Sequence, residues 1–161
     1  MGNEFSKQSA PDPPRVKFLI GGYAKVQELT FTASKSKIRK TYKNSSELNN
    51  TSDVNALAIT SDSATAIFGD MQGHLSRIDL TTKTITKTYL PISRGRITKL
   101  LITSSNKVLF TCDTDGALKS FSINTSGGLT PIKNFGRPLL NIYSMKMSKD
   151  NNFLFIAGKQ A

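Results

Sequence analysis

The hydrophobic pattern of residues 59–80 returns in residues 102–123, which is a period of 43 residues. In both segments a short run of β-branched and apolar residues is followed by a glycine-containing turn and then by a second, more widely spaced apolar pattern. Self-similarity at such a period is typical of small β-sheet units that stack on one another to bury their faces. The pattern therefore predicts an all-β repeat protein, and repeat architectures favour a binding function.

Four short strands can be placed in each period. The second strand ends on a small residue, and the third and first strands carry apolar residues at relative positions 0, 3 and 5. Thr, Ser, Val and Ile are frequent throughout, which favours strands over helices. The small residues are Gly21, Gly69, Cys112 and Ala157; the third-strand residues include Leu29, Ile78 and Phe121; the first-strand residues include Val54, Ile97 and Ile142; the fourth strands are predicted at 37–42, 84–89 and 131–135.

Gly73 and Gly116 are placed between the second and third strands, where a tight hairpin turn needs a residue that tolerates a positive φ. Asp70, Asp113 and Asp115 surround these turns. They lack the ligand spacing and the terminal Glu of a calcium loop. We interpret them as residues that stabilise the turns.

These units resemble the blades of WD40-type β-propellers over residues 16–161. The resemblance is carried by the apolar columns, the small residue of each second strand, the turn glycines and the Leu-x-x-Ile-Asp-Leu of residues 75–80. The chain departs from the family in having no Trp and no Gly-His before its first strands. The resemblance implies four-stranded antiparallel blades around a channel.

Counted in blades, the resemblance leads us to expect an incomplete propeller. The resemblance implies a partial propeller with two full blades and a part-blade at each end, preceded by a flexible leader over residues 1–15. Such a chain cannot close a ring, so we expect a fragment or a truncated product of a longer propeller ahead of a half-ring that assembles with a second copy or a partner. Self-association would cover the open blade faces. The blade parts are predicted at 16–43, 54–90, 97–135 and 140–161.

No residue set predicts catalysis. Cys112 lies in the small-residue column without a basic partner, Gly21-Gly22 is not followed by the Gly-Lys-Ser/Thr of a phosphate loop, and His74 has no second ligand at metal-binding spacing. We therefore expect no enzyme activity, no cofactor and no metal. The predicted function is a protein-interaction scaffold or adaptor.

The best candidates for contacting a partner protein are in loops. Arg94, Arg96 and Arg137 lie in connections that lead into first strands. The resemblance implies that these connections reach the face that propellers commonly use for ligands. His74, in a hairpin turn, is a further candidate.

The net charge and the N-terminal sequence suggest two alternative functions. The 22 Lys and Arg residues outnumber the 11 Asp and Glu residues, giving a net charge of +11 that attracts acidic proteins, membranes and nucleic acids alike. The start MGNEFS fits an N-myristoylation signal at Gly2, and one acyl chain needs a second attraction to hold a membrane. A basic run could supply it in a peripheral membrane adaptor, could bind RNA or DNA, or could simply face water. Its residues are Lys35, Lys37, Arg39, Lys40 and Lys43.

The expected location is the cytoplasm, with membrane association through the N-terminus if Gly2 is acylated. The single cysteine excludes an internal disulfide framework. No apolar run reaches the length of about 18 residues that a membrane-spanning helix needs, and residues 1–14 lack the apolar stretch of a secretory signal.

Overall fold

The computed structural model describes residues 16–22, 25–31, 36–43, 52–89, 91–124, 126 and 128–160. These residues form strands and no helix, so no helix long and apolar enough to cross a membrane is found among them. The predicted leader with Gly2 and the basic residue Lys35 lie outside the described residues, as does the side chain of Lys43.

The strands pair into four antiparallel sheets, which we call the first to fourth blades, and each sheet follows chain order without a crossover. The first blade consists of β1 (Val16–Gly22), β2 (Lys25–Phe31) and β3 (Ser36–Lys43); the second of β4 (Val54–Ile59), β5 (Thr65–Asp70), β6 (Leu75–Asp79) and β7 (Thr84–Tyr89); the third of β8 (Ile97–Ile102), β9 (Val108–Asp113), β10 (Leu118–Ile123) and β11 (Leu129–Asn134); the fourth of β12 (Asn141–Met147) and β13 (Leu154–Lys159).

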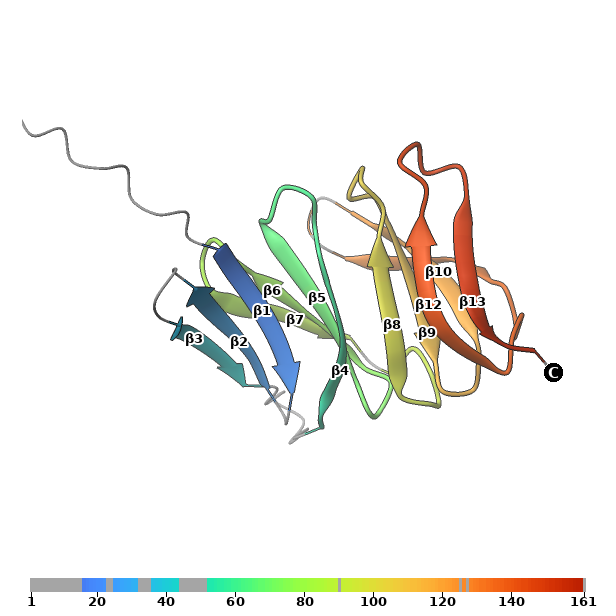
Figure 1. Ribbon diagram of the computed structural model, residues 1–161, viewed down its shortest axis with the longest axis horizontal. Helices are drawn as coiled ribbons and strands as arrows, with labels where there is room; N and C mark the ends of the chain where they lie inside the picture. Colours follow the sequence, from blue (N-terminus) through green and yellow to red (C-terminus); the bar gives the residue numbers. More distant parts are fainter. Residues whose placement is uncertain are drawn as a thin grey trace, which may run out of the picture.

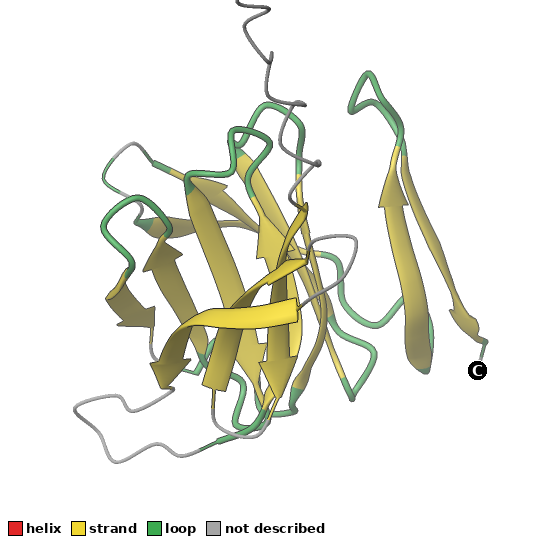
Figure 2. Ribbon diagram, turned by 60° about the vertical axis from the view of Figure 1, so that its left-hand side comes forward, coloured by secondary structure: helices red, strands yellow, loops and turns green. Residues whose placement is uncertain are grey.

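The blades stand side by side in an open row, with the first and fourth blades at opposite ends (Figure 1). Strands β1, β4, β8 and β12 lie next to one another along this row. Figure 2 shows the same arrangement from another side, with the last two strands forming a hairpin at one end. The predicted fold class, an all-β partial propeller of four-stranded antiparallel blades, is confirmed.

The small-residue column explains how one blade fits against the next. A Cβ atom added to Gly21 would lie 2.6 Å from Cγ1 of Val54, and one added to Gly69 would lie 2.5 Å from Cγ2 of Ile97. In the third blade, Cys112 shares a buried cluster with Ile142. The second strands of the first and second blades therefore leave room for a β-branched side chain from the first strand of the following blade.

Apolar clusters fill the spaces between neighbouring blades. The second blade contributes Phe68 and Ile78 to the cluster that it shares with the first blade, and it contributes Ile67 to the cluster that it shares with the third blade. These three side chains are almost completely buried. Because neighbouring strand residues point to opposite faces of a sheet, a complete blade has one apolar face toward each neighbour.

The turns between first and second strands are also linked from blade to blade. Asn106 and Asn151 adopt positive φ angles of 60° and 59°. The side-chain oxygen of Asn106 accepts a hydrogen bond from the Ser61 amide at 2.8 Å, and that of Asn151 accepts one from the Ser104 amide at 3.1 Å. This ladder fixes the relative position of three successive blades at one end of their strands.

Candidate partner-binding site

At the opposite end of the strands, two hairpin turns are built around buried aspartates. The Oδ1 atom of Asp113 accepts hydrogen bonds from the amides of Asp115 and Ala117, each at 2.9 Å. Asp70 repeats this arrangement with the amides of Gln72 and His74, also at 2.9 Å. The prediction that these two aspartates stabilise turns is confirmed.

Each turn also supports the connection into the next blade. Gly73 and Gly116 have φ angles of 80° and 76°, and an added Cβ atom would collide with the carbonyl oxygens of Ser93 and Leu139, respectively. The Asp113 carboxylate also accepts a hydrogen bond from the Ser93 hydroxyl. The connection between β7 and β8 is thus held between the turns of the second and third blades.

A pocket of about 300 Å³ opens between this connection, the β9–β10 turn and the segment that follows β11. Two of the arginines that were predicted to contact a partner protein, Arg94 and Arg137, both line this pocket, although 43 residues separate them in the sequence. The full lining is Ser93, Arg94, Asp113, Asp115, Ala117, Lys119, Asn134, Gly136 and Arg137. We call this the loop-end pocket.

The charged groups of the loop-end pocket differ in how firmly they are held. Asp113 is 4% exposed, and the turn and Ser93 engage both of its oxygens. Lys119 donates to the carbonyl of Ile92 at 2.5 Å. Arg137 pairs with Asp115 at 3.5 Å, and both of these side chains are largely exposed. Arg94 is exposed and forms no ion pair with another described residue.

The structure places the other two predicted partner-binding residues elsewhere. Arg96 is exposed, its carbonyl accepts a hydrogen bond from the Thr114 amide at 3.0 Å, and it does not line the loop-end pocket. His74 belongs to the turn of the second blade, where its Nδ1 lies 3.3 Å from Oδ2 of Asp70. The histidine is therefore part of a turn, as Asp70 is.

The basic run lies far from this pocket. Lys37, Arg39 and Lys40 are exposed on β3, the outer strand of the first blade, whereas the pocket lies on the third blade (Figure 1). The basic run and the loop-end pocket are therefore two separate surfaces.

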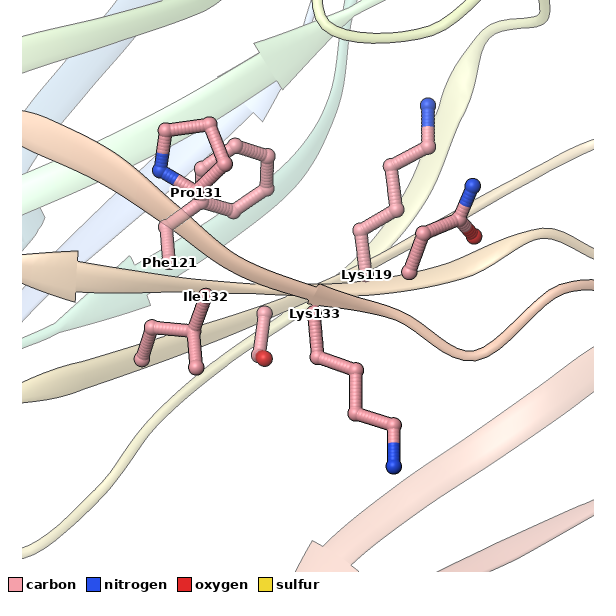
Figure 3. A pocket seen from close by; sticks show the side chains of 7 residues that line it. Lys119, Phe121, Pro131, Ile132 and Lys133 are labelled. Atoms are coloured by element: carbon pink, nitrogen blue, oxygen red, sulfur yellow. The ribbon is translucent and has the colours of Figure 1, made fainter.

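A smaller hollow of about 120 Å³ lies beside the loop-end pocket, on β10 and β11 (Figure 3). Phe121 pairs with Pro131 there, next to a bulge in the register between Ser120 and Phe121. Lys119 and Lys133 extend in opposite directions in this view. Lys119 lines both hollows, and its contact with Ile92 turns its ammonium group toward the loop-end pocket.

Sequence reasoning missed Ser93, Lys119 and Asn134 as lining residues. Ser93 could have been found, because it immediately precedes Arg94 in the same connection. Lys119 and Asn134 lie on strands. Nothing in the local sequence distinguishes Lys119 and Asn134 from lysines and asparagines that point away from the pocket.

Cys112 has the environment of a packing residue. It is 1% exposed, and its thiol donates to the Met145 sulfur at 3.2 Å. Burial raises the pKa of the thiol from 9.0 to about 12; the Asp113 carboxylate adds to this rise and Lys99 opposes it. The thiol is therefore protonated, and unreactive as a nucleophile, at neutral pH.

We expect Cys112 of the folded protein to resist iodoacetamide at pH 8, because both burial and protonation protect it. In denaturant the thiol becomes exposed, its pKa returns to about 9.0, and it should react quickly. Stability should also fall as the pH rises above that value, since the unfolded chain then loses a proton that the folded chain keeps. Mass spectrometry of labelled samples checks the first point; complete labelling without denaturant would contradict it.

Within the described part of the chain, no three His, Cys, Asp or Glu side chains lie close enough together to hold a metal ion. The loop-end pocket presents the cationic side chains of Arg94, Lys119 and Arg137, beside an Asp113 carboxylate that already accepts hydrogen bonds from the turn amides and from the Ser93 hydroxyl. Such an arrangement can bind and orient an anionic group.

No family model and no curated protein matches the sequence. Among solved structures, the chain is similar to the β-propeller domain of Cps50 (Swd1) from Myceliophteria thermophila, with a TM-score of 0.62 and 15% sequence identity. The similarity covers 83% of this chain and 49% of that one, so this chain spans about half the length of the propeller domain that it matches. At this identity the likeness shows the fold, that of a β-propeller.

Proposed function

We propose that the protein is a non-catalytic protein-interaction module that docks an acidic segment of a partner protein at the loop-end pocket. The observation that carries the proposal is the convergence of Arg94, Lys119 and Arg137, from three separate chain segments, on one pocket. Rigid sheets that present binding loops are a common way to build such sites. The propeller fold supports a binding role because its strands hold the connecting loops in fixed positions.

The electrostatics of the pocket favour a carboxylate or phosphorylated side chain. Asp113 is engaged in the turn, so its charge is already compensated by amide and hydroxyl donors. Asp115 and Arg137 form an exposed pair at 3.5 Å, an arrangement that contributes little to stability. An incoming anion can therefore replace Asp115 as the partner of Arg137 and reach Arg94 as well.

A selection from a random peptide library tests this proposal. Peptides retained by the wild-type protein should be enriched in Asp and Glu, and they should lose at least about tenfold in affinity for the double variant Arg94→Glu/Lys119→Glu, since two favourable charge contacts become repulsive. Isothermal titration with synthetic peptides gives the affinities. The same peptides with Gln and Asn in place of Glu and Asp should bind weakly.

The matched control is the double variant Lys107→Glu/Lys149→Glu. It makes the same change in net charge, but these exposed lysines lie in turns at the other end of the strands. This variant should bind the selected peptides like the wild type. Equal weakening by both double variants, or retained peptides without acidic residues, would contradict docking at the loop-end pocket.

We propose a peripheral membrane adaptor as the second candidate function, because Lys37, Arg39 and Lys40 are exposed together on β3. Each basic residue near an anionic surface contributes about 1 kcal/mol, and an acyl chain at Gly2 would add to this attraction. The acylated protein should float with phosphatidylserine vesicles, and Gly2→Ala or Lys37→Glu/Lys40→Glu should abolish flotation. Sedimentation of the acylated wild type away from the vesicles would contradict this candidate.

Nucleic-acid binding by the same β3 surface makes a different prediction. Affinity for RNA or duplex DNA would fall steeply as salt rises, because each neutralised phosphate releases counterions. A titration of a fluorescent oligonucleotide at two salt concentrations measures this slope, and a flat response excludes phosphate binding.

A further inference from the structure

The outer face of the fourth blade carries two exposed phenyl rings. Phe153 and Phe155 are 63% and 62% exposed, and their ring centroids lie 6.4 Å apart. Phe155 stands two residues before the small residue Ala157, as Ile67 stands before Gly69 and Phe110 before Cys112. Ile67 is 1% exposed, and Phe110 packs against the cluster between the third and fourth blades. Phe155 therefore occupies a position that another blade covers elsewhere in the molecule.

The first blade, at the other end of the row, also has an exposed apolar face. Ile20 and Ile38 are 50% and 52% exposed. Ile20 precedes Gly21 as Phe68 precedes Gly69, and Ile38 pairs with Leu29 as Ile85 pairs with Ile78 in the second blade. In the second blade, Phe68, Ile78 and Ile85 all pack in the cluster against the first blade. The exposed face of the first blade is thus the face that would receive a preceding blade.

The two exposed faces are the two complementary sides of an inter-blade interface that the molecule already forms internally. They lie at opposite ends of the row of blades (Figure 1). We propose that a second copy of this chain covers them, with the fourth blade of one copy packing its Phe153–Phe155 face on the Ile20–Ile38 face of the first blade of the other. Such a head-to-tail contact is heterologous, and two identical contacts close into a ring if the rotation between copies permits.

Two observations favour a second copy over another occupant. Both halves of the interface are present on one chain, so the contact continues the internal packing of the blades. In addition, the similarity covers 49% of the propeller domain, so the blades of one chain form an open row that a second copy can continue. The +11 charge of each copy opposes the contact, and added salt should therefore strengthen it.

Sedimentation velocity of the full chain over a range of concentrations tests the proposal. The wild type should sediment as a dimer that becomes more populated in higher salt. Phe155→Lys and Ile38→Lys should each be monomeric, because each variant has lost one side of the contact. An equimolar mixture of the two variants should associate, but more weakly than the wild type, since the intact fourth blade of one meets the intact first blade of the other at one contact while the second contact carries both lysines.

The control is Ile132→Lys, which changes an isoleucine that is 56% exposed on β11 and not on either end face; it should remain dimeric. Circular dichroism should show the same β-sheet content for all variants, because the replaced side chains are exposed. A monomeric wild type, a dimer in either single variant, or a mixture that associates no more than either variant alone would overturn the proposal. An open series of larger species would overturn the closed ring.

Discussion

Replacing Gly69 with alanine is expected to lower the free energy of unfolding by about 2 kcal/mol, although alanine normally favours a strand over glycine by ~0.5–1 kcal/mol. The added Cβ atom would lie 2.5 Å from Cγ2 and 2.6 Å from Cβ of Ile97. Ile97 is fully buried and branched at the clashing atom, so it cannot rotate away. The clash therefore outweighs the gain in strand propensity. Urea unfolding followed by circular dichroism measures the change.

A double-mutant cycle identifies the cause. Ile97→Ala alone should cost about 2–5 kcal/mol because it leaves a cavity, and the Gly69→Ala/Ile97→Ala protein should be more stable than the sum of the single losses predicts. Gly22→Ala is the control, because nothing lies within 4 Å of the Cβ position there. It should be neutral or slightly stabilising. Equal behaviour of the two glycine variants would contradict the packing of Gly69 against the third blade.

Replacing Asp113 with alanine is expected to cost about 3 kcal/mol, since hydrogen bonds to a charged group contribute ~1.5–3 kcal/mol and their buried donors are left unsatisfied. The variant loses the acceptor of the Asp115 and Ala117 amides and of the Ser93 hydroxyl. Denaturant unfolding measures the stability. Because Ser93 and the β9–β10 turn form two walls of the loop-end pocket, affinity for acidic peptides should fall as well.

Asp115→Ala separates the structural role from simple charge removal. Asp115 is exposed, and its carboxylate pairs with Arg137 at 3.5 Å. Stability should therefore change little, and acidic peptides should bind more tightly, since Arg137 loses its competing partner. A loss of stability as large as that of Asp113→Ala would contradict the stated difference between the buried, hydrogen-bonded Asp113 and the exposed Asp115.

The strand positions and the column of small residues could be predicted because the chemistry recurs along the chain. A small residue opposite a β-branched residue appears as Gly21 with Val54 and as Gly69 with Ile97. Both columns are visible in the sequence as regular spacing, and the structure adds that they contact each other. The turn aspartates were predictable for the same reason, as Asp70 and Asp113 occupy equivalent positions.

The composition of the pocket could not be predicted to the same extent. Arg94 and Arg96 are two residues apart in one connection, yet only Arg94 lines the pocket. Which of them does so depends on the local path of the backbone beside Gly95, where an added Cβ would lie 2.5 Å from the Thr114 hydroxyl. The Asn106 and Asn151 ladder was missed because each asparagine contacts a turn that is more than 40 residues away.

The proline in β11 has a consequence for how the molecule can aggregate. Pro131 has no amide hydrogen, and it lies beside the bulge at the outer edge of the third blade. A further strand that approached this edge would find its hydrogen-bonding row interrupted, with the charged Lys133 close by. Lateral, amyloid-like growth from the outer edge of the third blade is therefore disfavoured.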